Sequence, residues 1–105
     1  MSKSQSHQRA QSKAAGRGGK TEVKIKDTNK RLDAVTKSGK TATEVERSGS
    51  QHLLEKAARR LGARRSQRKV LQVPQPDMSK AVQAMKNKGV KGTVKNMTGT
   101  KRRSV

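Results

Sequence analysis

The chain contains no Phe, Trp or Tyr, and this feature of the sequence most constrains what it can fold into. Hydrophobic residues make up only 28% of the 105 residues, which is near the range in which chains fail to fold alone. Any core must therefore be small and built from Val, Leu, Ile, Ala and Met. At this length the chain forms one domain at most.

The charge of the chain is strongly positive. It carries 27 Lys and Arg residues against seven Asp and Glu residues, a formal net charge of +20. Such a field attracts polyanions, nucleic acid first and then an acidic protein or an anionic membrane. Without aromatic side chains there is no platform on which bases can stack. We therefore expect binding through phosphate contacts, with weak sequence preference and strong salt dependence.

Several classes of site are excluded by composition. The absence of cysteine rules out disulfides, thiolate zinc sites and thiol nucleophiles. The two histidines, His7 and His52, are far apart in sequence, so a histidine metal site is not expected. We find no apolar run of membrane-spanning length and no signal-peptide segment after Met1. We expect no membrane partner and a cytoplasmic location, in its own cell or in a target cell that receives it.

The sequence divides into three segments. Residues 1–20 contain no acid and almost no large apolar side chain, so they are predicted to form a disordered basic arm. Residues 21–96 show the hydrophobic periodicity of an ordered α/β domain. Residues 97–105 are again basic and are predicted to be a loose tail.

The first half of the ordered segment is predicted to be an antiparallel meander. Three stretches alternate polar and apolar residues, as half-buried strands do: 22–26, 31–35 and 42–46. Turns are expected over 27–30 and at Ser38 and Gly39. In the register that these turns set, Leu32 meets Val45 and the apolar residues share one face.

The other face of this meander brings two acids together. The register places Asp33 opposite Glu44, with Lys24 opposite Asp33 on the neighbouring strand and Arg31 opposite Glu46. Like charges directly opposite each other destabilise a strand pair, and a protein that accepts them often holds a cation between them. The alternative is that the acids are surface residues neutralised by nearby cations, and that Glu46 forms a cross-strand ion pair with Arg31.

Two helices and two strands are expected to follow the meander. A capping pattern at Ser48 begins a helix over 48–62, and its apolar stripe is predicted to be core: Leu53, Leu54, Ala57, Ala58 and Leu61. A buried strand over 70–73, a helix over about 77–89 and a strand over 90–96 complete the pattern. The predicted order is β-β-β-α-β-α-β, an α/β layering with helices on the apolar face of the sheet.

An Asp on the second strand and a Glu on the third, followed by a helix and a returning strand, resemble the core of the PD-(D/E)xK nuclease superfamily. The resemblance is carried by residues 31–35 (RLDAV) and 43–49 (TEVERSG), and is closest to small bacterial toxin and restriction-type nuclease domains. It implies a small three-layer restriction-endonuclease-like core and hydrolysis of DNA or RNA. Two features depart from the family. Glu46 stands where the family has Lys, and residues 1–20 offer no acid-bearing helix before the first strand.

The resemblance also implies a metal site. Asp33, Glu44 and the backbone carbonyl of Val45 would hold Mg²⁺ or Mn²⁺, hard cations that prefer oxygen ligands. Such an ion activates water and polarises the scissile phosphate. Three interpretations of the position of Glu46 stay open. Glu46 binds a second metal or acts as a base, or Lys24 supplies the missing ammonium, or the site is weak or inactive.

The partners expected from this sequence are nucleic acid and, if the chain is a toxin, an acidic immunity protein. The residues predicted to contact nucleic acid are basic and flank the motif or follow the first helix: Arg31, Lys40, Arg47, Arg64, Arg65, Arg68 and Lys69. The alternative function is a non-enzymatic basic protein that coats nucleic acid or joins a ribonucleoprotein. A third hypothesis is an adaptor that folds only on an acidic protein.

Overall fold

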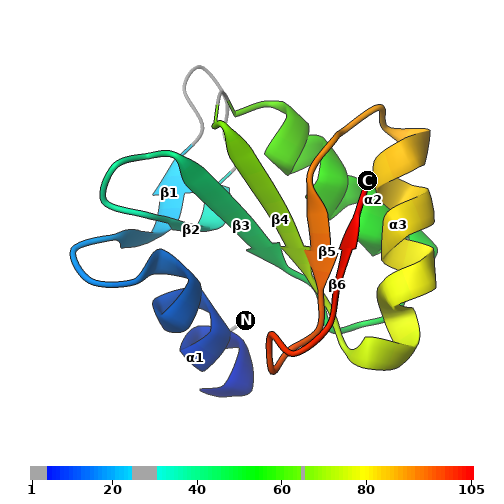
Figure 1. The fold of residues 1–105 in the computed structure, drawn as a ribbon, viewed down its shortest axis with the longest axis horizontal. Helices are drawn as coiled ribbons and strands as arrows, with labels where there is room; N and C mark the ends of the chain where they lie inside the picture. The colour runs from blue at the N-terminus through cyan, green and yellow to red at the C-terminus, as the bar shows by residue number, and fades with distance from the viewer. Residues whose placement is uncertain (1–4, 25–30, 65) are drawn as a thin grey trace.

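The computed structural model describes residues 5–24, 31–64 and 66–105. Its described residues form three α-helices and one six-stranded mixed sheet with strand order β1-β2-β3-β4-β5-β6 (Figure 1). In chain order the elements are α1 (Gln5–Ala15), β1 (Lys20–Lys24), β2 (Arg31–Val35), β3 (Thr41–Val45), α2 (Gln51–Gly62), β4 (Arg68–Gln72), the 3₁₀ turn η1 (Gln75–Asp77), α3 (Met78–Asn87), β5 (Thr93–Lys95) and β6 (Arg102–Ser104). The β3–β4 and β4–β5 pairs are parallel, and α2 and α3 make the two crossovers.

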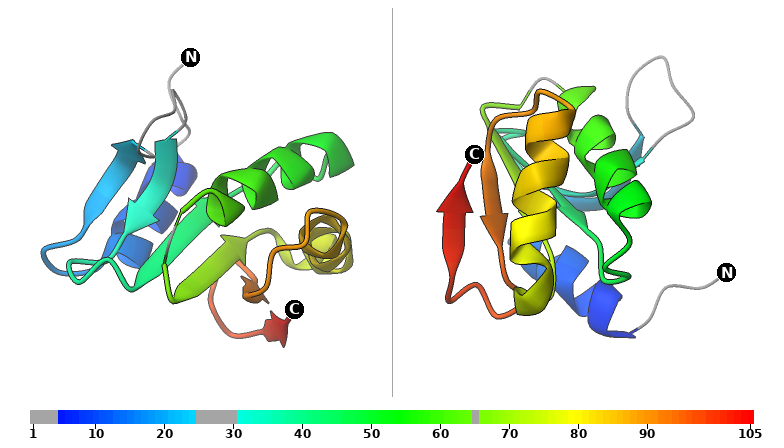
Figure 2. Two further views of the ribbon diagram at one scale, coloured as in Figure 1. Left: turned by 90° about the horizontal axis from the view of Figure 1, so that it is seen from above. Right: turned by 90° about the vertical axis from the view of Figure 1, so that its right-hand side faces the viewer.

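Helices α2 and α3 pack on each other and cover one face of the sheet (Figure 2). The core between them and the sheet is aliphatic, and its fully buried members include Leu54, Leu61, Leu71, Met85 and Val94. The predicted α2 stripe is confirmed except at Leu53, which is 38% exposed. None of the described helices is both long and apolar enough to cross a membrane.

The predicted order β-β-β-α-β-α-β is confirmed, but the chain adds an element at each end. The prediction of a disordered arm is wrong for residues 5–15, which form α1 and pack against β1, β2 and β3. The prediction of a loose tail is wrong for Arg102–Ser104, which form β6 and pair with β5. Backbone hydrogen bonds in both directions between Gly92 and Val105 extend that pairing.

Small residues allow α1 to dock. Ala10 and Ala15 are buried in the contact, so the backbone of α1 can come close to the sheet. Gly19, which follows the helix, has no room for a side chain, because a Cβ there would lie 1.9 Å from the Ala15 carbonyl oxygen. A pattern based on large apolar residues does not detect a helix that is buried in this way.

The predicted register of β2 and β3 is confirmed. Ala34 pairs with Thr43 and Val35 pairs with Ala42. The connecting turn is closed by the Gly39 N–H, which donates to the Thr36 carbonyl at 2.8 Å, and Gly39 adopts φ +74°. Because glycine adopts positive φ without steric cost, the Ser-Gly pair fixes this turn and hence the register.

The predicted register of β1 and β2 is wrong by two residues. Thr21 pairs with Ala34 and Lys24 pairs with Arg31, so Glu22 rather than Lys24 lies level with Asp33. A shift of two keeps every side chain on its predicted face, so alternation alone could not detect it. The connection over 25–30 and the side chains of Lys24 and Arg31 lie outside the described residues.

The N-cap of α2 is Ser50 rather than the predicted Ser48. The Ser50 Oγ accepts a hydrogen bond from Leu53 N at 3.4 Å, while the Ser48 Oγ accepts one from Ser50 N. We expect Ser50→Ala to lower the free energy of unfolding by about 1 kcal/mol, the usual cost of a lost N-cap. Urea denaturation measures the loss, and Ser48→Ala is expected to cost less. An equal loss for both variants would contradict the assignment of the cap.

Candidate active site

Asp33 lies at the end of the β2–β3 ladder with its carboxylate buried, 4% exposed. Its Oδ2 accepts a hydrogen bond from the backbone N–H of Val45 at 2.7 Å. Its Oδ1 lies 2.7 Å from Gln11 Nε2, which donates to it, and 3.0 Å from His7 Nε2. A β3 backbone group and two α1 side chains therefore fix the orientation of this carboxylate.

Glu44 follows Thr43 on β3, one position beyond the Ala34–Thr43 pair at which the β2–β3 ladder ends. It is 1% exposed and is one of the largest fully buried side chains among the described residues. Its Oε2 lies 3.7 Å from Nη1 of Arg60 on α2. A carboxylate removed from water is costly unless it is paired. Asp33 contacts Gln11 of α1 and Glu44 contacts Arg60 of α2, and because α1 and α2 lie on opposite faces of the sheet, the two carboxylates are held on different sides of it.

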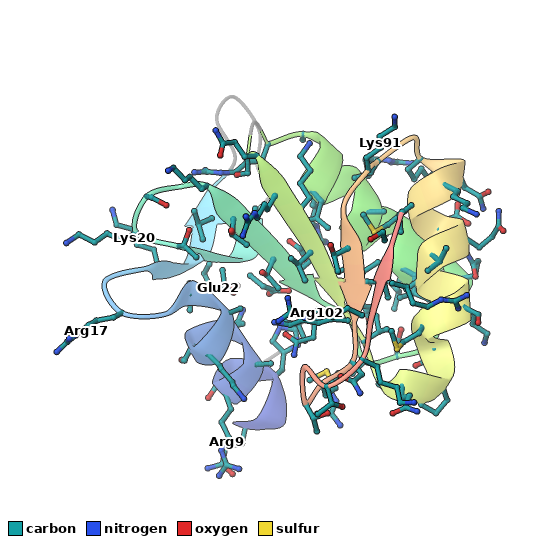
Figure 3. The ribbon with its side chains drawn as sticks, viewed as in Figure 1. Arg9, Arg17, Lys20, Glu22, Lys91 and Arg102 are labelled. Carbon is teal, nitrogen blue, oxygen red and sulfur yellow. The ribbon has the colours of Figure 1, made fainter. Side chains whose placement is uncertain are left out.

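A third acid, Glu22, reaches the same place from β1. The Gln11 side-chain nitrogen donates to Glu22 Oε2 at 2.8 Å as well as to Asp33, so one amide joins two carboxylates. Figure 3 shows Glu22 between β1 and α1. Glu22 has φ +53°, a conformation that non-glycine residues rarely adopt outside functional or tightly constrained positions.

Sequence reasoning missed the contributions of His7, Gln11 and Glu22 to this site. Glu22 looks like a solvated acid in the sequence, and α1 was not expected. The available signal was the spacing of His7, Ala10, Gln11 and Ala14, which places small and polar residues on one face of a helix.

Glu46, which stands where the family has Lys, lies just after β3. Its backbone N–H donates to the Gln72 carbonyl at 3.0 Å, and its Oε1 accepts a hydrogen bond from Ser48 N at 3.0 Å. The side chain therefore helps to close the turn into α2. The predicted ion pair between Glu46 and Arg31 involves a side chain outside the described residues.

The site offers oxygen donors for a hard cation. The implied ligands are two buried carboxylates and one backbone carbonyl, which are donors of the kind that Mg²⁺ prefers. In the described part of the chain, no group of three or more His, Cys, Asp or Glu side chains is arranged to hold a metal ion. The implied set contains only two such side chains, Asp33 and Glu44, and its donors fit the ion in kind.

The predicted nucleic-acid contacts divide into two places. Arg47 is exposed and follows β3 at the end where the acids lie. Lys40, Arg64 and Arg68 gather at the opposite end of β3 and β4, where Arg68 N donates to the Lys40 carbonyl and Arg64 Nε donates to Ser66 Oγ. Lys69 follows on β4, and Arg65 lies outside the described residues.

Comparisons with protein-family models, with curated proteins and with solved structures find no match. Membership of the PD-(D/E)xK superfamily is therefore a proposal that depends on the residues and the topology of this chain. The site has to be interpreted from its own geometry.

Proposed function

We propose that this protein is a metal-dependent nuclease that hydrolyses phosphodiester bonds in DNA or RNA. The observation that carries the proposal is the burial of Asp33 on β2 and Glu44 on β3, the two acids that the resemblance assigns as metal ligands. The chain has only seven acids and a net charge of +20, so solvent-exposed cations that could pair with acids at its surface are abundant. Burying carboxylates has a free-energy cost that binding a divalent cation would offset.

The topology supports the finer assignment to a restriction-endonuclease-like core. An antiparallel meander, β1-β2-β3, is followed by a helical crossover to a parallel β4, and the acids lie on the second and third strands. Helix α1 precedes the meander, in the place where the family has its usual first helix. In this chain that helix brings Gln11 and His7, rather than an acid, to Asp33.

The resemblance assigns Mg²⁺ or Mn²⁺ to Asp33, Glu44 and the carbonyl of Val45, whose oxygen donors suit such an ion in kind. When bound, the ion would supply an activated water and polarise the scissile phosphate. The chain's own contribution is positioning, because the Val45 N–H and the Gln11 amide fix the Asp33 carboxylate. The hydrogen bond of Glu46 to Ser48 favours a structural role for Glu46 over that of a base.

The test is cleavage by the full chain of supercoiled plasmid and of single-stranded RNA, each with Mg²⁺, with Mn²⁺ and with EDTA. We expect cutting of at least one substrate with a metal, none in EDTA, and recovery when excess metal is added. Binding that falls steeply with salt, with no cutting under any metal, would instead support the non-enzymatic coating protein. If the chain is a toxin, its basic surface would suit an acidic immunity protein.

A further inference from the structure

A groove crosses the face of the sheet that α2 and α3 leave open. Its floor includes Thr43 on β3, Thr93 and Lys95 on β5, and Arg102 on β6, while alternate residues of β3, β4 and β5 face the α2–α3 core. The C-terminal end of α1 borders it through Lys13, and the cavity volume is about 490 Å³. In Figure 3, Arg102 lies in front of the lower end of the sheet, on the side toward α1.

The groove is basic throughout. Its lining includes five Lys and Arg residues and no acid: Lys13, Arg68, Lys69, Lys95 and Arg102. Burial, together with repulsion from Arg102 and Lys13, holds the pKa of Lys95 below its ordinary value. Cations from α1, β5 and β6 therefore repel one another across the groove, and an anion placed between them would relieve that repulsion.

We propose that this groove binds the phosphate backbone of one nucleic-acid strand, at a site separate from the acids. The groove is lined by residues of β3, β4, β5 and β6, an extent that suits a repeating polyanion better than a single small anion. Thr41 and Thr93, which are partly exposed, add hydroxyl donors to the cations. Because the chain has no aromatic residue, the contact is with phosphates rather than with stacked bases.

Helix α1 links the groove to the candidate active site. Gln11 contacts Asp33, and Lys13 borders the groove. The two residues are two positions apart, which is about 3 Å along the helix axis. A strand held in the groove would therefore pass close to the segment of α1 that contacts Asp33. The inference rests on the proposed function for the identity of the polyanion, but binding by the groove can be measured without cleavage.

The test compares two triple variants that lose the same charge. The groove variant removes the three cations that repel one another across the groove: Lys13→Gln, Lys95→Gln and Arg102→Gln. The control variant removes three exposed lysines that do not line the groove: Lys56→Gln, Lys86→Gln and Lys91→Gln. Binding of a fluorescent 20-nucleotide single strand is measured in EDTA over a range of salt concentrations, so that no metal-dependent cutting occurs.

We expect the groove variant to bind about tenfold more weakly, with a salt slope shallower by about 2 because two to three phosphate contacts are lost. The control variant is expected to stay within about threefold of the wild type, since net charge alone acts weakly at a distance. Equal losses in the two variants, or wild-type binding by the groove variant, would overturn the proposal. The single change Arg102→Gln, at an exposed position, gives a second measurement should the triple variant fail to fold.

Cleavage assays separate this inference from the proposed function. If the chain cuts nucleic acid but the groove variant binds normally, the groove assignment fails and the nuclease stands. If the groove variant loses binding and the wild type cuts nothing, the nuclease fails and the groove stands. Relief of repulsion at Lys95 also predicts that the groove variant melts no lower than the wild type at low salt.

Discussion

Asp33→Asn and Glu44→Gln are each expected to lower the rate of metal-dependent cleavage by about 10³-fold or more, the scale of removing a key electrostatic group from an active site. Each change keeps the shape of the side chain but removes the negative charge that would hold a hard cation. Affinity for nucleic acid in EDTA should remain within about threefold of the wild type, because neither residue lies in the basic groove. Initial rates with Mg²⁺ and with Mn²⁺ measure the effect.

The matched control is Glu55→Gln, an acid on α2 away from the site. Hydrogen bonds from Gln51 and Asn87 hold the pKa of Glu55 below its usual value, so it too is a hydrogen-bonded carboxylate. We expect Glu55→Gln to keep the wild-type rate. Cleavage at the wild-type rate by Asp33→Asn, or an equal loss of cleavage rate in all three variants, would show that the two acids take no specific part in cleavage. Circular dichroism establishes that each variant is folded.

The parts of the fold that were predictable from sequence depend on local signals. The β2–β3 hairpin follows from strict alternation around a Ser-Gly turn, and its register was predicted correctly. The α2 stripe is similarly local, although periodicity could not show that Leu53 is partly exposed while Leu54 is fully buried. The side chains around Asp33 and Glu44 were not predictable in this way, because Asp33 contacts α1 and Glu44 contacts Arg60 of α2.

The parts that could not be predicted depend on contacts between distant segments. The β1–β2 register differs from its prediction by two residues, which alternation cannot detect, and it places Glu22 where Gln11 can join it to Asp33. Helix α1 buries Ala10 and Gln11 rather than large apolar side chains, so its sequence resembles a disordered arm. The groove depends on strand β6 pairing with β5, which brings Arg102 level with Lys95.

Leu54→Ala is expected to lower the free energy of unfolding by about 3 kcal/mol, within the range for a buried leucine that leaves a cavity. Leu54 is fully buried between α2 and the sheet, in a core without aromatic residues to fill the gap. A small domain has a total stability of roughly 5–15 kcal/mol, so this one change removes a large share of it. Urea denaturation should show a lower midpoint with an unchanged m-value.

Leu53→Ala is the control for Leu54→Ala, since it makes the same chemical change one residue earlier in the same helix. Leu53 is 38% exposed, so its truncation removes less surface from the core, and we expect a loss below about 1 kcal/mol. Comparing Leu54→Ala with Asp33→Asn also separates loss of folding from loss of catalysis. Leu54→Ala should lose cleavage only at temperatures at which it unfolds, whereas Asp33→Asn should be inactive while fully folded. Equal destabilisation by the two leucine variants would mean that α2 does not present Leu54 to the sheet, and the positions of Glu44 and Arg60 would then be in doubt as well.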